Sequence, residues 1–165
     1  MLTQHDAEGL VARYQMDPHP EGGFYKQLYL GQTEGQPDGR PMFSTIIYLM
    51  EKGKMSAFHS VTMDELWNYH SGLPVVIVEL LPEGKTRESI LGCGVGQVPQ
   101  IVMRAGSMFG AYPLDDHSGS DYSFLGCVCV PAFRFSDWNM PPRATLLAMY
   151  PQPEARAIIE KLTYP

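Results

Sequence analysis

The chain has 165 residues, enough for one domain with a sizeable core and no need of disulfide staples. Its 18 acidic residues outnumber 12 basic ones, and the formal charge of −6 argues against nucleic acid and anionic lipid as partners. The first residues lack the pattern of a secretory signal, and no apolar run reaches the roughly 18 to 20 residues of a membrane span. We therefore expect a single domain over residues 1–165, located in the cytoplasm.

The predicted elements begin with an amphipathic helix at residues 3–16, with Thr3 as a candidate N-cap. A polar, glycine-rich loop is predicted at residues 31–40, and a last helix at residues 155–162. Between the helices, short apolar runs alternate with Gly, Pro and Asp turns. These runs predict strands at residues 24–30, 44–50, 58–61, 65–70, 75–80, 89–92, 100–104, 107–112, 124–130 and 133–135. Many short strands at this spacing are typical of a β-sandwich or β-barrel.

The most informative segment begins at Gly53. His59 follows after five intervening residues, Val61 stands two residues later, Glu65 comes after three more residues, and Gly72 ends the segment. This spacing resembles the first signature of the cupin superfamily, which has a second histidine at the position of Val61.

A second resemblance lies further along the chain. Residues 104–106, Arg-Ala-Gly, stand where the second cupin signature has P-x-G, and Phe109 occupies the place of its histidine. Catalytic transition-metal sites use three or four donor atoms. Because Val61 and Phe109 remove two of the four usual cupin donors, we expect no bound metal or other cofactor.

Ordered landmarks along most of the chain also resemble the DUF985 (cupin 5) family of uncharacterised proteins. They lie at residues 19–25 (HPEGGFY), 44–48 (STIIY), 58–59 (FH), 64–67 (DELW), 99–100 (PQ), 126–127 (GC) and 130–131 (VP). The resemblance implies an all-β cupin double-stranded β-helix, or jelly-roll barrel, with flanking N- and C-terminal helices. It also implies a homodimer and no established reaction, so function has to be argued from the pocket.

Candidate pocket residues follow from strand alternation, because side chains two apart on a strand share a face. His59 and Glu65 are the candidate catalytic pair, and His70 should point away because it has the opposite parity. A buried Glu65 needs a cation, a histidinium or a hydrogen-bonding ligand beside it. The candidate ligand-binding residues are Trp67, Tyr69, Phe109, Tyr48, Gln100 and Lys26, with Ser44 as a further polar contact.

The turn at residues 19–23 (HPEGG) has two interpretations. Its two glycines suffice to explain a tight entry into the first strand, whereas a role at the pocket rim would come from Tyr25 or Lys26. Cys127 and Cys129 share a strand face, as a soft-metal or redox pair or, more commonly, as small buried residues. The acidic run from Asp115 to His117 reads as a cation site or, more commonly, as a solvated loop.

These patterns predict a protein that binds a small polar or carbohydrate-like molecule. The first hypothesis is a metal-independent isomerase or epimerase with His59 as base and Glu65 as its orienting group or as acid. The second is a non-catalytic module that binds or senses a small ligand. The third is a metal-dependent oxygenase or isomerase, which would require donors outside the cupin positions.

Overall fold

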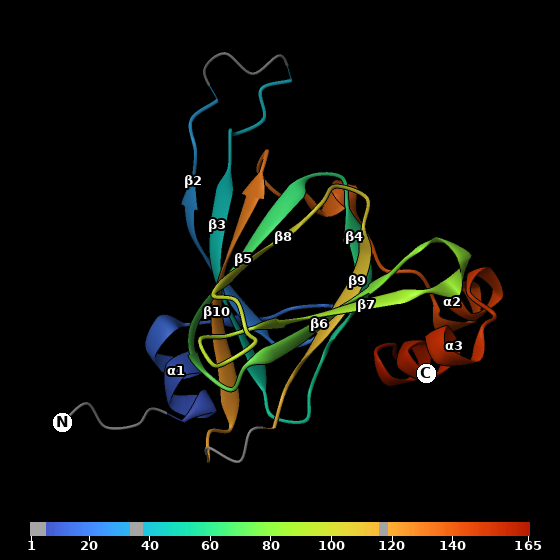
Figure 1. The fold of residues 1–165 in the computed structure, drawn as a ribbon. Helices are drawn as coiled ribbons and strands as arrows, with labels where there is room; N and C mark the ends of the chain where they lie inside the picture. Colours follow the sequence, from blue (N-terminus) through green and yellow to red (C-terminus); the bar gives the residue numbers. More distant parts are fainter. Residues whose placement is uncertain (1–5, 34–37, 116–118) are drawn as a thin grey trace.

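The computed structural model describes residues 6–33, 38–115 and 119–165, and it has two antiparallel sheets that face each other (Figure 1). The first sheet has the strand order β1-β2-β3-β10-β5-β8, and the second the order β11-β4-β9-β6-β7. The strands are β1 (Asp17–Pro18), β2 (Phe24–Leu30), β3 (Ser44–Glu51), β4 (Ser56–Val61), β5 (Asp64–Gly72), β6 (Val75–Leu80), β7 (Thr86–Leu91), β8 (Gln100–Met103), β9 (Met108–Pro113), β10 (Tyr122–Val130) and β11 (Trp138–Asn139). The all-β architecture predicted from the sequence is confirmed.

Helices cover the outer face of each sheet (Figure 1). Helix α1 (Ala7–Tyr14) packs with Leu10 against Ile47 and Leu49, which are the outward residues of β3. Helices α2 (Arg143–Met149) and α3 (Pro153–Lys161) pack against the outward valines of β6 in the other sheet. Because β3 and β6 are covered on both faces, they are almost continuously apolar rather than alternating.

Most of the predicted elements are confirmed, and a few differ. Helix α2 was not predicted, and residues 133–135 form no strand; a 3₁₀ turn at Phe135–Asp137 leads into β11 instead. The first helix takes its N-cap from Asp6, whose side chain accepts a hydrogen bond from Gly9 N–H at 2.8 Å. Thr3 and His117 lie outside the described residues. Within those residues, no helix has the length and apolarity that a bilayer span requires.

The space between the sheets is filled at one end and hollow at the other. A cluster of buried residues fills much of this space, and members such as Val75, Leu91 and Leu125 do not line the pocket. Tyr69 packs into this cluster, and its hydroxyl donates to Gly72 O at 2.6 Å. The other end is left open for a site, beneath the segment that runs from residue 131 to β11.

Candidate functional site

A pocket of about 380 Å³ occupies the open end between the sheets. This volume lies in the range of pockets that hold small molecules. Strand residues from both sheets form its inner wall: Lys26, Ser44, Ile46, Tyr48, His59, Val61, Glu65, Trp67, Cys127 and Cys129. The turn before β2 adds His19 and Glu21. The segment from residue 131 to β11, which we call the roof, adds Phe133, Arg134, Phe135 and Trp138.

His59 and Glu65 reach the pocket from opposite sheets. His59 lies on β4 and is 2% exposed, and Glu65 lies on β5 and is 8% exposed. Trp67 follows Glu65 on the same face of β5, as strand alternation predicts. The two sheets therefore bring an imidazole and a carboxyl group into the same pocket.

The tautomer of His59 is set by a backbone carbonyl. Its Nδ1 lies 2.8 Å from Ala57 O, and a carbonyl oxygen only accepts, so Nδ1 carries a proton. Nε2 is then the nitrogen that takes up or releases a proton, and it lies 3.4 Å from Glu21 Oε2. This is the usual arrangement of a histidine that works as an acid or base.

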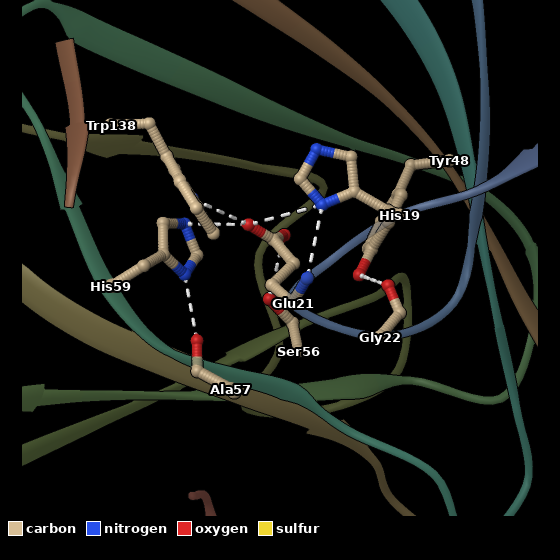
Figure 2. A network of polar contacts seen from close by, with 8 residues as sticks. All are labelled: His19, Glu21, Gly22, Tyr48, Ser56, Ala57, His59 and Trp138. Carbon is tan, nitrogen blue, oxygen red and sulfur yellow. Dashed lines mark hydrogen bonds and ion pairs between the residues drawn. The ribbon is translucent and has the colours of Figure 1, made fainter. Parts of the chain in front are cut away.

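Glu21 is the centre of the polar network shown in Figure 2. Ser56 Oγ donates to its Oε1 at 2.8 Å, and Trp138 Nε1 donates to its Oε2 at 3.2 Å. With His59 Nε2 near the same oxygen, the buried carboxylate has two hydrogen bonds and a potential cationic partner. Such pairing is what a buried carboxylate requires.

The HPEGG turn positions Glu21. Gly22 has φ of +116°, and a Cβ atom there would lie 2.0 Å from Met55 O, so only glycine fits without a backbone shift. Tyr48 Oη donates to Gly22 O at 2.6 Å, and Ala57 N–H donates to Glu21 O at 2.7 Å. These bonds hold the turn between the two sheets and direct the Glu21 side chain inward.

His19 is the second histidine of the site. Its Nδ1 accepts a hydrogen bond from Glu21 N–H at 3.4 Å (Figure 2). Burial lowers the pKa of His19, and Glu21 opposes this effect while the charge of His59 adds to it. His19 is therefore neutral, with its proton on Nε2, and the 3.4 Å approach of Nδ1 to Glu21 Oε2 is a contact rather than an ion pair.

Glu65 is a buried carboxyl group of the pocket whose acidity is strongly altered. Burial raises its pKa from the ordinary 4.5 to about 7. The charge of His59 works against this rise, Glu21 adds to it, and the side chains of Trp67 and Cys127 lower the pKa by smaller amounts. A carboxyl group with a pKa near neutral pH can act as both acid and base.

Two further groups border Glu65. Trp67 is 1% exposed, and its Nε1–H makes no hydrogen bond among the described residues, although its side chain lies near enough to Glu65 to lower the pKa of that carboxyl group. Cys127 and Cys129 are buried on the same face of β10, as expected. Burial raises the pKa of both thiols, so neither is activated as a thiolate.

Three predicted ligand-binding residues do not line the pocket. Tyr69 and Phe109 face the interior, but they fill it: Tyr69 lies in the filled end, and Phe109 packs against the rings of His59 and Trp67 at centroid distances of 4.4 and 5.9 Å. Gln100 donates to Asn68 Oδ1 at 2.6 Å and is exposed on β8. The role of these three residues in binding a ligand stays a prediction, and the described lining of the pocket does not include them.

The structure places three other candidate residues on the pocket lining, and their role in binding a ligand stays a prediction. Tyr48, Lys26 and Ser44 line the pocket, and His70 is exposed on the outer face of β5. Sequence reasoning missed His19 and Glu21 as site residues, because only the fold brings their turn between the two sheets. The motif itself was the available signal, but its glycines already had a structural explanation.

The roof of the pocket was also missed. Arg40 holds it, because its Nε donates to Ala132 O at 2.8 Å and its Nη2 pairs with Asp137. Trp138 then reaches down to Glu21. The expected strand at residues 133–135 concealed this role, since aromatic runs also predict strands.

The residues present do not fit a cupin metal centre. The four cupin positions hold His59, Val61, Glu65 and Phe109, so two of the four carry no metal-binding atom. Across the described residues, no three His, Cys, Asp or Glu side chains come together as a metal-binding group. The chemistry proposed for this pocket therefore uses only side chains of the protein.

Comparisons with known proteins agree with this fold. A protein from Shewanella oneidensis (SO0799) is 33% identical with a TM-score of 0.87, covering 97% of this chain and 98% of that one. A hypothetical protein from Leishmania major is 28% identical with a TM-score of 0.86, covering 97% and 99%. Oxalate decarboxylase from Bacillus subtilis, in its structure at pH 4.6, is 12% identical with a TM-score of 0.56, covering 88% of this chain and 36% of that one, and shares the fold alone.

No curated protein matches this sequence. The family model described as "Cupin superfamily (DUF985)" matches residues 8–141, which is most of the chain. The strand order, the spacing from Gly53 to Gly72 and this match all agree. The chain belongs to the DUF985 family of the cupin superfamily.

Proposed function

We propose that the protein binds a small polar, carbohydrate-like molecule in this pocket and moves protons on it without a metal, as isomerases and epimerases do. The observation that carries the proposal is Glu65, a buried carboxyl with a pKa of about 7 that lines the same pocket as His59. Strongly shifted acidity in a pocket is a marker of acid–base sites. Aromatic side chains such as Tyr25 and Trp138 offer flat faces for a sugar ring.

The proposed step begins with His59. Its Nε2 takes a proton from a carbon next to a carbonyl group, and the C–H electron pair forms a C=C bond. Glu65 in its acid form gives its proton to the carbonyl oxygen, so an enediol results. An isomer forms when His59 returns its proton to the former carbonyl carbon while the Glu65 carboxylate takes the hydroxyl proton from the adjacent carbon, where the new C=O bond forms. An epimer forms when water protonates the original carbon on its opposite face, His59 releases its proton to water, and Glu65 takes back the proton from the original carbonyl oxygen. No net oxidation occurs in either case.

Glu21 supports this step as a positioning residue. Its carboxylate stabilises the imidazolium that forms when His59 takes up the proton, because Oε2 lies 3.4 Å from Nε2. Ser56 and Trp138 hold the carboxylate by hydrogen bonds to its two oxygens. The turn at Gly22 and the roof therefore contribute to the proposed chemistry through Glu21.

The test is exchange of carbon-bound hydrogen in D₂O, followed by ¹H NMR over a panel of ketoses and aldoses. We expect loss of one C–H signal in at least one sugar, and no loss with His59→Gln or Glu65→Gln. His70→Gln, a histidine on the outer face of β5, is the matched control and should keep the wild-type rate. A panel without any exchange contradicts catalysis.

The second candidate is a non-catalytic module that binds or senses a small ligand. The apolar Val61 and Phe109 at two cupin donor positions favour it, because they replace two side chains that could otherwise take part in activating a ligand. Saturable binding of a sugar without exchange or turnover would select this function.

A further inference from the structure

The indole N–H of Trp67, on the inner wall of the pocket, is buried and makes no hydrogen bond within the part of the chain that the structure describes. It is almost completely buried, at 1% exposure. Buried N–H groups in folded proteins nearly always have an acceptor, because the loss of water has to be compensated. A bound ligand that supplies an acceptor atom would give the Trp67 N–H its missing hydrogen bond.

The second tryptophan makes the contrast clear. The chain has two tryptophans, and both line the same pocket. Trp138 donates its N–H to Glu21 at 3.2 Å, whereas the N–H of Trp67 has no hydrogen-bond acceptor in the described structure. The pocket therefore does contain an acceptor for an indole N–H. Trp67 lacks one because of where it lies in the pocket wall.

The Trp67 ring is also held rigidly. Tyr48 packs edge-on against it at a centroid distance of 5.8 Å, and Phe109 does so at 5.9 Å on the neighbouring sheet. Its N–H direction is therefore fixed before a ligand arrives. Donors fixed in advance are those that stabilise a developing charge most effectively.

The neighbourhood of Trp67 selects the kind of acceptor. Glu65 lies two residues earlier on the same face of β5, and in its acid form it is a second donor. A carbonyl or carboxylate oxygen suits a place between two donors because it only accepts, whereas a hydroxyl oxygen would need a third group to accept its own proton. A carboxylate would face the negative charge of Glu21, which Glu65 already senses, so a neutral carbonyl is favoured.

We propose that Trp67 N–H binds the carbonyl oxygen of the substrate, which is therefore an open-chain ketose or a similar keto compound, and that the same N–H stabilises this oxygen as it becomes an enolate. This inference rests on the proposed function for its catalytic part. Trp67 shares the oxygen with the proton of Glu65 while His59 acts on the adjacent carbon. The bond changes are those given above, and Trp67 loses no proton.

The binding test uses protein labelled with ¹⁵N at its tryptophan indoles, which gives two indole signals. Trp67→Phe and Trp138→Phe assign them. The probes are D-ribulose and ribitol, which differ only in the reduction of the carbonyl. We expect D-ribulose to move the Trp67 signal, and ribitol to leave it unchanged. Equal shifts with both probes, or none with D-ribulose, overturn the inference.

The catalytic test uses the exchange rate of Trp67→Phe, which keeps an aromatic ring and removes the N–H. Loss of one fixed donor to a developing oxyanion lowers kcat by roughly 100-fold, with little change in KM. A full rate in this variant overturns the catalytic role while the proposed function stands. A Trp67 shift with D-ribulose without any exchange supports the carbonyl site and contradicts the enzyme. The wild-type NMR titration decides the binding claim even if the variant fails to fold.

Discussion

Replacement of Glu65 by glutamine should change how the stability of the protein depends on pH. Burial raises the pKa of Glu65 from 4.5 to about 7, and at 8% exposure the group is only slightly shielded by solvent. In the unfolded chain the carboxyl ionises near 4.5, whereas in the folded protein it keeps its proton until about 7. The folded state therefore loses stability as pH rises through this window.

The magnitude follows from the size of the pKa change. A rise from 4.5 to about 7, at about 1.4 kcal/mol per pKa unit, amounts to about 3 kcal/mol of unfolding free energy. This contribution is fully present below pH 4.5 and is lost above pH 7. Between pH 5 and pH 8 the wild type should lose about 2.5 kcal/mol relative to Glu65→Gln, which has no proton to lose.

The assay is urea unfolding followed by tryptophan fluorescence at several pH values from 5 to 8. The informative quantity is the difference in unfolding free energy between Glu65→Gln and the wild type, because His59 and Glu21 are present in both proteins. Glu88→Gln, at an exposed position on β7, is the matched control. A difference that stays constant over this range, or one that falls as pH rises, refutes the reasoning.

Three other predictions concern the turn, the metal donors and the edge of the first sheet. Gly22→Ala should cost at least about 3 kcal/mol of stability in urea unfolding, because its Cβ would meet backbone, whereas Gly53→Ala, with open space around it, should cost only about 1 kcal/mol. Val61→His combined with Phe109→His should create zinc or nickel affinity by calorimetry that the parent lacks; one copurifying metal per parent chain by elemental analysis would contradict the donor count. We expect a homodimer through β2, whose edge beyond Tyr25 has no partner strand in the described residues, so Leu28→Glu should shift sedimentation toward the monomer; an unchanged sedimentation coefficient counts against this interface.

Local rules determined much of the fold from the sequence. Strand alternation depends only on backbone geometry, so the spacing from Gly53 to Gly72 placed His59, Glu65 and Trp67 correctly on inner faces. The same rule explains why His70 points outward. The bounds of β2 and β6 also agree with their apolar runs, because turn residues end them on both sides.

Tertiary structure decided which inner positions face a pocket and which fill the core. Strand parity gives Tyr69 and Trp67 the same face, but it contains no information on how far the core extends between the sheets. Tyr69 therefore lies in the filled end, while Trp67 lines the cavity. Likewise, Phe109 has an inward position on β9 but packs behind His59.

The acid–base network depended most strongly on tertiary contacts. Glu21 meets His59 across 38 positions of the chain and Trp138 across 117, so no local pattern could reveal that the three converge. The acidity of Glu65 likewise arises from burial between two sheets, a property of the packed protein and not of its sequence neighbours. The sequence by itself determined the cupin frame and the inward candidates on its strands; their electrostatic environment came from the packing of segments that are distant in the chain.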